Sequence, residues 1–93
     1  MRLLLPLLAL ASLLTLADNP QPKLKALILD GQNNHKWEIT TPVLRHALES
    51  SGAFTVDVST TPPKGAPADA WSSWKPDFTA YDVVVSNYNG ESW

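Results

Sequence analysis

The sequence contains no cysteine, which excludes disulfides as a source of stability. Its two histidines are too few to build a structural zinc site on their own. Its seven basic residues are scattered, which argues against nucleic acid as a partner. The glycine-rich motifs of dinucleotide-binding and P-loop proteins are missing, as is the nucleophile motif of α/β-hydrolases. The fold must therefore rest on a packed core, and none of these common functions has its motif here.

Long apolar runs are also scarce. The longest, residues 3–16, is shorter than the roughly 20 apolar residues that a membrane-spanning helix needs. Arg2 precedes it and a small residue, Ala17, follows it, as in a secretory signal peptide. We predict that residues 1–17 are a cleaved signal peptide, with a retained membrane anchor as the alternative, and that residues 18–22 are a polar linker. The protein would then be secreted or periplasmic and would meet a membrane only during export.

Three further segments predict strands of a parallel sheet. Residues 24–29 form an apolar run that stops at Asp30 and Gly31. Residues 54–59 alternate between apolar and polar, which is typical of a strand nearer the sheet edge, and residues 82–86 form a β-branched run typical of a fully buried strand. The sequence therefore predicts an α/β fold. In the common doubly wound order, the second strand lies outside the first and the third pairs on its other side.

One clear helix is predicted between the first two strands. Residues 40–51 place apolar side chains at helical spacing. Thr41 is a candidate N-cap, Pro42 would occupy the first helical position, and Gly52 follows the end. The first βαβ unit is then complete by Ser59.

The proline-rich residues 60–81 predict a long crossover with one short helical turn around residues 68–74. Its aromatic side chains could present a face for stacking on sugars. We expect instead that all four pack in the hydrophobic core: Trp71, Trp74, Phe78 and Tyr81. The reason is that Phe78 and Tyr81 directly precede the third strand, at the sheet edge opposite the crevice.

The predicted strand order brings two polar loops together, residues 31–37 and residues 87–93. The chain reverses direction between the first and third strands, and ligands of open α/β sheets bind at such a switch point. Amides hydrogen-bond hydroxyls and indoles stack on sugar rings, so we expect a small polar ligand. The candidate binding residues are Gln32, Asn33, Asn34, Trp37, Asn87, Asn89, Gly90 and Trp93.

His35 is the candidate catalytic residue, because an imidazole at the strand ends can act as a general base or orient a substrate. The alternative is a histidine that merely hydrogen-bonds nearby backbone. Asp30 is expected to shape the turn by accepting backbone N–H bonds, with a metal role as the alternative. No spaced set of acidic residues and histidines accompanies it, so we assign no metal residue. The cofactor is unknown, and the oligomeric state stays open.

These segments resemble the ThuA-like (trehalose utilisation) family, whose fold is that of class I glutamine amidotransferases. The matching features are the strand 25–30 running into residues 31–35, then Trp37, Thr41, Pro42 and Leu44, and residues 81–86 followed by residues 87–90 and Trp93. The resemblance implies a flavodoxin-like, doubly wound parallel sheet, of which residues 23–93 would be the amino-terminal portion. It also implies that His35 and the loop carrying Asn87 and Asn89 line a sugar site. ThuA-like proteins are generally not regarded as amidotransferases, and the amidotransferase cysteine would fall after Trp93.

We therefore expect an exported protein of carbohydrate utilisation that acts on trehalose or on keto-disaccharides. As an enzyme it would be a hydrolase, lyase or isomerase of keto-sugars. The alternative is a non-catalytic carbohydrate-binding or accessory module with an amidotransferase-like fold. Ionisable residues at the ends of later strands would favour the enzyme.

The mature piece, residues 18–93, is expected to be the first part of a larger domain, because only one clear helix is available to cover a sheet that needs both faces covered. Expressed alone, it should be unfolded, aggregated or molten. Circular dichroism during heating checks this, and a sharp cooperative transition would contradict it.

Overall fold

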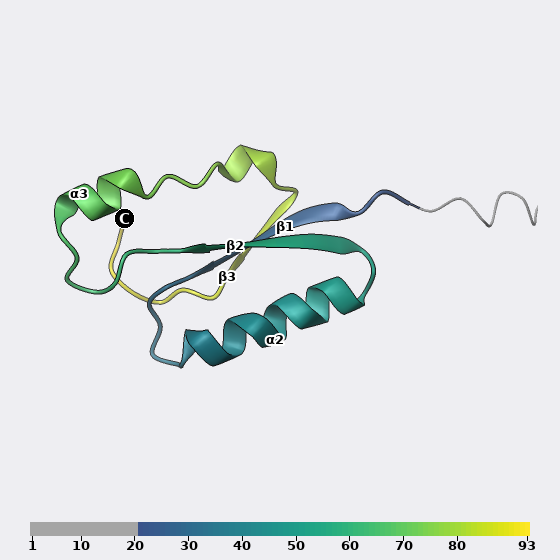
Figure 1. Ribbon diagram of the computed structural model, residues 1–93, viewed down its shortest axis with the longest axis horizontal. Helices are drawn as coiled ribbons and strands as arrows, with labels where there is room; N and C mark the ends of the chain where they lie inside the picture. Colours follow the sequence, from purple (N-terminus) through teal and green to yellow (C-terminus); the bar gives the residue numbers. More distant parts are fainter. Residues whose placement is uncertain (1–20) are drawn as a thin grey trace, which may run out of the picture.

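A computed structural model describes residues 21–93, so the predicted signal peptide and most of the predicted linker lie outside the described residues. The described chain forms β1 (Leu24–Asp30), α2 (Trp37–Ser50), β2 (Phe54–Thr60), α3 (Ala68–Ser73), the short 3-10 helix η1 (Phe78–Ala80) and β3 (Val83–Ser86). The strands are parallel in the order β2-β1-β3 (Figure 1). This confirms the α/β class and the predicted strand order. Within residues 21–93, no helix has the length and apolar character needed to cross a membrane.

The central strand β1 holds the core. It pairs with β2 from Leu24 opposite Phe54 to Asp30 opposite Thr60, and with β3 from Ala26 opposite Val83. Four consecutive side chains are at most 4 % exposed, since neighbours lie at both edges and on both faces: Ala26, Leu27, Ile28 and Leu29. An apolar run without alternation is what such a strand requires.

The two faces of the sheet are covered by different segments (Figure 1). Ala26, Ile28 and Val56 form the buried cluster on one face, and Leu44 and Leu48 of α2 pack against it. The crossover lies on the other face.

Two hydrogen bonds tie the crossover to β2. The indole N–H of Trp74 donates to Ser59 Oγ at 3.0 Å, and Tyr81 Oη donates to Asp57 Oδ2 at 2.8 Å. The hydrogen bond to Asp57 raises the pKa of Tyr81 above its usual value. The alternating pattern of β2 therefore reflects an apolar face toward α2 and a polar face toward the crossover.

The helix begins earlier than predicted. α2 starts at Trp37, with Lys36 in the N-cap position, and Pro42 lies inside the helix. The predicted cap, Thr41, is wrong because its hydroxyl is buried and donates to the Asp30 carboxylate at 2.8 Å. The predicted end is confirmed: the helix stops at Ser50, and Gly52 has a φ of 76°.

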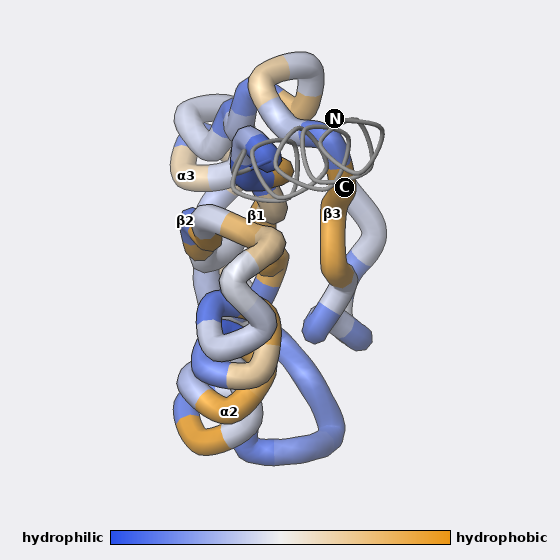
Figure 2. The backbone as a smooth tube through the Cα atoms, turned by 90° about the vertical axis from the view of Figure 1, so that its right-hand side faces the viewer, coloured by the Kyte–Doolittle hydropathy of each residue, from blue (hydrophilic) through white to orange (hydrophobic). Residues whose placement is uncertain are grey.

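The third strand is not fully buried, contrary to the sequence-based prediction. Val83 and Val84 are 38 % and 40 % exposed. In the described chain α2 packs on β2 and β1, so β3 receives little cover from it. Figure 2 shows the hydrophobic colouring of β3 beside the other strands. Only Val85 joins the packing around the core.

Gly31 makes the turn after β1 possible. Its φ is 121°, and a Cβ there would lie 2.2 Å from Thr61 Oγ1 and 2.7 Å from Thr61 N. Gly31→Ala should lower the free energy of unfolding of the full-length protein by at least about 2 kcal/mol, from overpacking and backbone strain together. Urea unfolding measures this. Gly65→Ala is the matched control, because Gly65 has a φ of 80° but open space around it; it should cost about 1 kcal/mol. Equal losses for the two variants would contradict the close contact.

Candidate functional site

The two predicted loops meet at the carboxyl edge of the sheet. The ladder between β1 and β3 continues into them, because Asn87 N donates to Leu29 O and Asn89 N donates to Gln32 O, both at 2.9 Å. Their neighbour is the loop after β2, since all three described strands are parallel and end at the same edge. Thr61 N donates to Asp30 O at 2.9 Å and begins that third loop beside β1.

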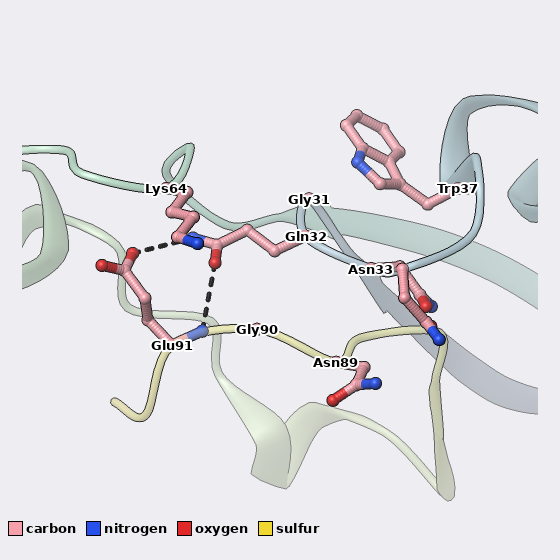
Figure 3. A pocket seen from close by; sticks show the side chains of 9 residues that line it. Gly31, Gln32, Asn33, Trp37, Lys64, Asn89, Gly90 and Glu91 are labelled. Atoms are coloured by element: carbon pink, nitrogen blue, oxygen red, sulfur yellow. Dashed lines mark hydrogen bonds between the residues drawn. The ribbon is translucent and has the colours of Figure 1, made fainter.

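The Gln32 side chain joins all three loops (Figure 3). Its Nε2 donates to Pro62 O at 3.0 Å and to Glu91 Oε2 at 3.1 Å, and its Oε1 accepts from Glu91 N at 3.1 Å. Gln32 is only 8 % exposed. Gly90 packs so closely on it that a Cβ would lie 2.4 Å from Gln32 Oε1. Because Gly90 has no side chain, the loop after β3 can pack closely against the loop after β1.

An open hollow of about 600 Å³ lies between these loops. Six of the predicted site residues line it: Gln32, Asn33, Asn34, Trp37, Asn89 and Gly90. Gly31, Lys64 and Glu91 also line it, and sequence reasoning missed them as site residues. The signal for Lys64 was its place in the loop after β2, whose carboxyl end lies at the same sheet edge. The hollow is thus lined by amides, one indole, one ammonium and one carboxylate.

The structure places the other three predicted residues outside this lining. His35 is exposed, and its backbone N–H donates to Asn33 Oδ1 at 3.2 Å. Asn87 donates from Nδ2 to Thr40 Oγ1 at 2.9 Å and to Thr41 Oγ1 at 3.0 Å. Trp93 is 59 % exposed and lies against the crossover. The roles proposed for these three residues remain predictions.

Aromatic side chains form a second hollow, of about 470 Å³, on the crossover side. Trp93 meets Trp74 edge-on with ring centroids 5.0 Å apart and stacks on Phe78 at 6.0 Å, while Trp71 meets Trp74 at 6.0 Å. These contacts connect the end of the described chain to α3 and η1. Trp71, Trp74 and Phe78 therefore pack with each other and with Trp93 and not in the buried cluster around Ala26 and Ile28. The prediction that they pack in the core is wrong, because the crossover holds them together beyond the sheet and leaves Phe78 38 % exposed.

The carboxylate of Glu91 is held in place by two donors. Glu91 Oε2 accepts from Gly65 N at 3.3 Å as well as from Gln32. Tyr88 Oη donates to Glu91 O at 2.5 Å. Burial raises the pKa of Tyr88, and the negative charge of Glu91 raises it further. Within residues 21–93, no three His, Asp or Glu side chains gather as metal ligands would.

The fold and the site together describe an α/β protein with a polar hollow at the carboxyl edge of a parallel sheet. The chain is similar to the crystal structure of a protein from Parabacteroides merdae whose description goes no further than ThuA-like, with 42% sequence identity and a TM-score of 0.71. The match covers 77% of this chain and supports the resemblance to ThuA-like proteins. It covers only 25% of the other chain, so the present chain spans about a quarter of that protein's length. No protein-family profile and no curated protein matches the chain.

Proposed function

We propose that this chain is the amino-terminal part of an exported ThuA-like domain that binds a sugar of the trehalose or keto-disaccharide type at the carboxyl edge of its sheet. The observation that carries the proposal is the hollow between residues 31–37 and residues 87–91, with its amide lining and its indole. The similarity to a ThuA-like protein supports the ThuA-like part of the proposal.

The lining suits a polyhydroxylated ligand. Asn34 and Asn89 are exposed amides, and each offers two donors and one acceptor to neighbouring hydroxyls. The half-buried indole of Trp37 offers a flat apolar surface to the C–H face of a sugar ring. Gln32 contributes less, because both of its amide hydrogens are already used on Pro62 and Glu91. A sugar would therefore contact Asn34, Asn89 and Trp37 first.

In the enzyme form of this proposal, His35 transfers a proton or orients the substrate. It lies in sequence between two lining residues, Asn34 and Trp37, and is exposed. An imidazole that reaches a substrate can act as a general acid or base. Glu91 would supply the carboxylate of such a reaction, since it lines the hollow itself.

A non-catalytic carbohydrate-binding module is the second candidate. One observation favours it: the His35 side chain is not among the residues that line the hollow. Binding by amides and an indole needs no proton transfer, so the same site would hold a sugar without reacting with it.

Sugar binding is tested first at Trp37. Trp37→Ala in the full-length protein should weaken the binding of trehalose or a 3-keto disaccharide about fivefold, because one ring-stacking contact is lost. Titration calorimetry with both sugars measures the dissociation constants. Trp71→Ala is the matched control, since Trp71 lies in the second hollow and its loss should leave the affinity unchanged. If wild-type protein binds neither sugar, or if Trp37→Ala binds as wild type does, the proposal fails.

His35→Ala separates the two candidates. In an enzyme it should abolish turnover of a 3-keto disaccharide while leaving the melting temperature nearly unchanged, because His35 is exposed and donates to Asn33 only through its backbone. Product formation and thermal unfolding are measured on the same preparation. Unaltered turnover rules His35 out of the reaction, and sugar binding without turnover in the wild type supports the module.

A further inference from the structure

Asp30 is a buried carboxylate that the proposed sugar site does not use directly. It is the last residue of β1 and is 2 % exposed. Its Oδ1 accepts from Thr60 Oγ1 at 2.6 Å, and its Oδ2 accepts from Thr41 Oγ1 at 2.8 Å. The sequence suggested backbone N–H donors, whereas the structure supplies two hydroxyls. A buried carboxylate needs such donors, because its desolvation is costly.

Within residues 21–93, only the Thr41 hydroxyl continues into a longer chain of hydrogen bonds, and the Thr60 hydroxyl does not. Thr41 Oγ1 accepts from Asn87 Nδ2 at 3.0 Å, and Asn87 Oδ1 accepts from Asn33 Nδ2 at 3.3 Å. We name these three side chains, Thr41, Asn87 and Asn33, the amide relay. The amide relay connects Asp30 at the end of β1, through Thr41 of α2, to both loops of the site. Its last member, Asn33, lines the hollow.

The Asp30 carboxylate sets the direction of the bonds in the amide relay, and Thr40 Oγ1 supports the same direction by also accepting from Asn87 Nδ2. A carboxylate only accepts, so Thr41 gives its single hydroxyl hydrogen to Asp30 and can only accept from Asn87. Asn87 must then turn its Nδ2 toward Thr41 and its Oδ1 toward Asn33. Asn33 in turn donates from Nδ2, which leaves its Oδ1 to accept the His35 N–H at 3.2 Å.

We propose that Asp30 and Thr41 are positioning residues that set the orientation of the Asn33 amide for recognition of sugar hydroxyls. This rests on the proposed sugar-binding function. With one Nδ2 hydrogen and one Oδ1 lone pair engaged, Asn33 retains one donor and one acceptor of fixed orientation. Such a pair matches two adjacent hydroxyls of a pyranose. A reversed amide would present them in the wrong order.

Thr60 provides a matched control, because it donates to the same carboxylate but does not belong to the amide relay. Valine has the shape of threonine without the hydroxyl, so Thr41→Val and Thr60→Val each remove one hydrogen bond from Asp30. Only Thr41→Val also removes one of the two acceptors of Asn87 Nδ2, so that Thr40 Oγ1 is left as its partner on α2. Thr41→Ser keeps the hydroxyl and should restore wild-type behaviour.

The test uses ¹⁵N-labelled full-length protein. In the wild type, the side-chain NH₂ hydrogens of Asn87 should show nuclear Overhauser effects to the Thr40 and Thr41 methyl groups. The side-chain NH₂ signals of Asn33 and Asn87 should keep their wild-type shifts in Thr60→Val and Thr41→Ser and lose them in Thr41→Val. Trehalose affinity, by calorimetry, should fall at least fivefold in Thr41→Val and less than twofold in the other two.

Each outcome decides the matter. Missing Overhauser effects in the wild type overturn the proposal even if Thr41→Val does not fold. Equal amide shifts or equal affinities in Thr41→Val and Thr60→Val overturn it as well, because the bond to Asp30 would then be merely structural. If the amide signals behave as expected but wild-type protein binds no trehalose or 3-keto disaccharide, the relay stands and the proposed sugar function fails.

Discussion

The whole site depends on the position of β1 between two parallel neighbours. Its buried run from Ala26 to Leu29 supplies the core, and full burial of each leucine or isoleucine contributes about 1.5–3 kcal/mol. Because β2 and β3 both run parallel to β1, the three strands deliver their following loops to one edge. The register fixes this edge: Asp30 lies opposite Thr60, and Leu29 lies opposite Ser86. A change of register would separate the loops that form the hollow.

Beyond the strand ends, side chains replace backbone groups as hydrogen-bond partners between the loops. Asn87 and Asn89 still donate from their backbones to the β1 side, but the Glu91 N–H finds the Gln32 side chain in place of a backbone carbonyl. Each such bond contributes only about 1 kcal/mol net, yet leaving a buried partner unpaired costs more. The loops are therefore joined before any ligand arrives. A hollow that is already formed loses little conformational entropy on binding, which favours affinity for a small polar ligand.

The sequence predicted the elements of the fold better than the roles of its polar residues. Apolar runs and Gly52 located the strands and the helix end, because burial and a positive φ leave direct traces in residue type. The helix start was wrong because a threonine hydroxyl suits a cap and a buried carboxylate equally well, and only the fold shows that Thr41 faces Asp30.

For the site as well, the sequence located the loops better than the roles of the side chains that they carry. The two facing loops followed from the strand order, which the common doubly wound topology supplied once the apolar runs had located the strands. Lys64 was missed because its proline-rich loop carries no periodicity that would place it, although it follows β2 at the same edge. Trp93 was placed in the crevice because it belongs to the right loop, yet its ring packs on Trp74 and Phe78. Side-chain direction at a chain turn depends on contacts that residue type alone does not contain.

Not all of the side-chain amides near the hollow are available to bind a ligand. Gln32 uses its two donors to join the three loops, and Asn87 uses its amide to link α2 with Asn33. What remains for a sugar is smaller: the exposed amides of Asn34 and Asn89, and the half of Asn33 that the relay leaves unengaged. The polar residues thus divide into those that build the hollow and those that face its contents. Because Gln32 and Asn87 join the loops that carry the second group, residues of the same type both build the hollow and line it.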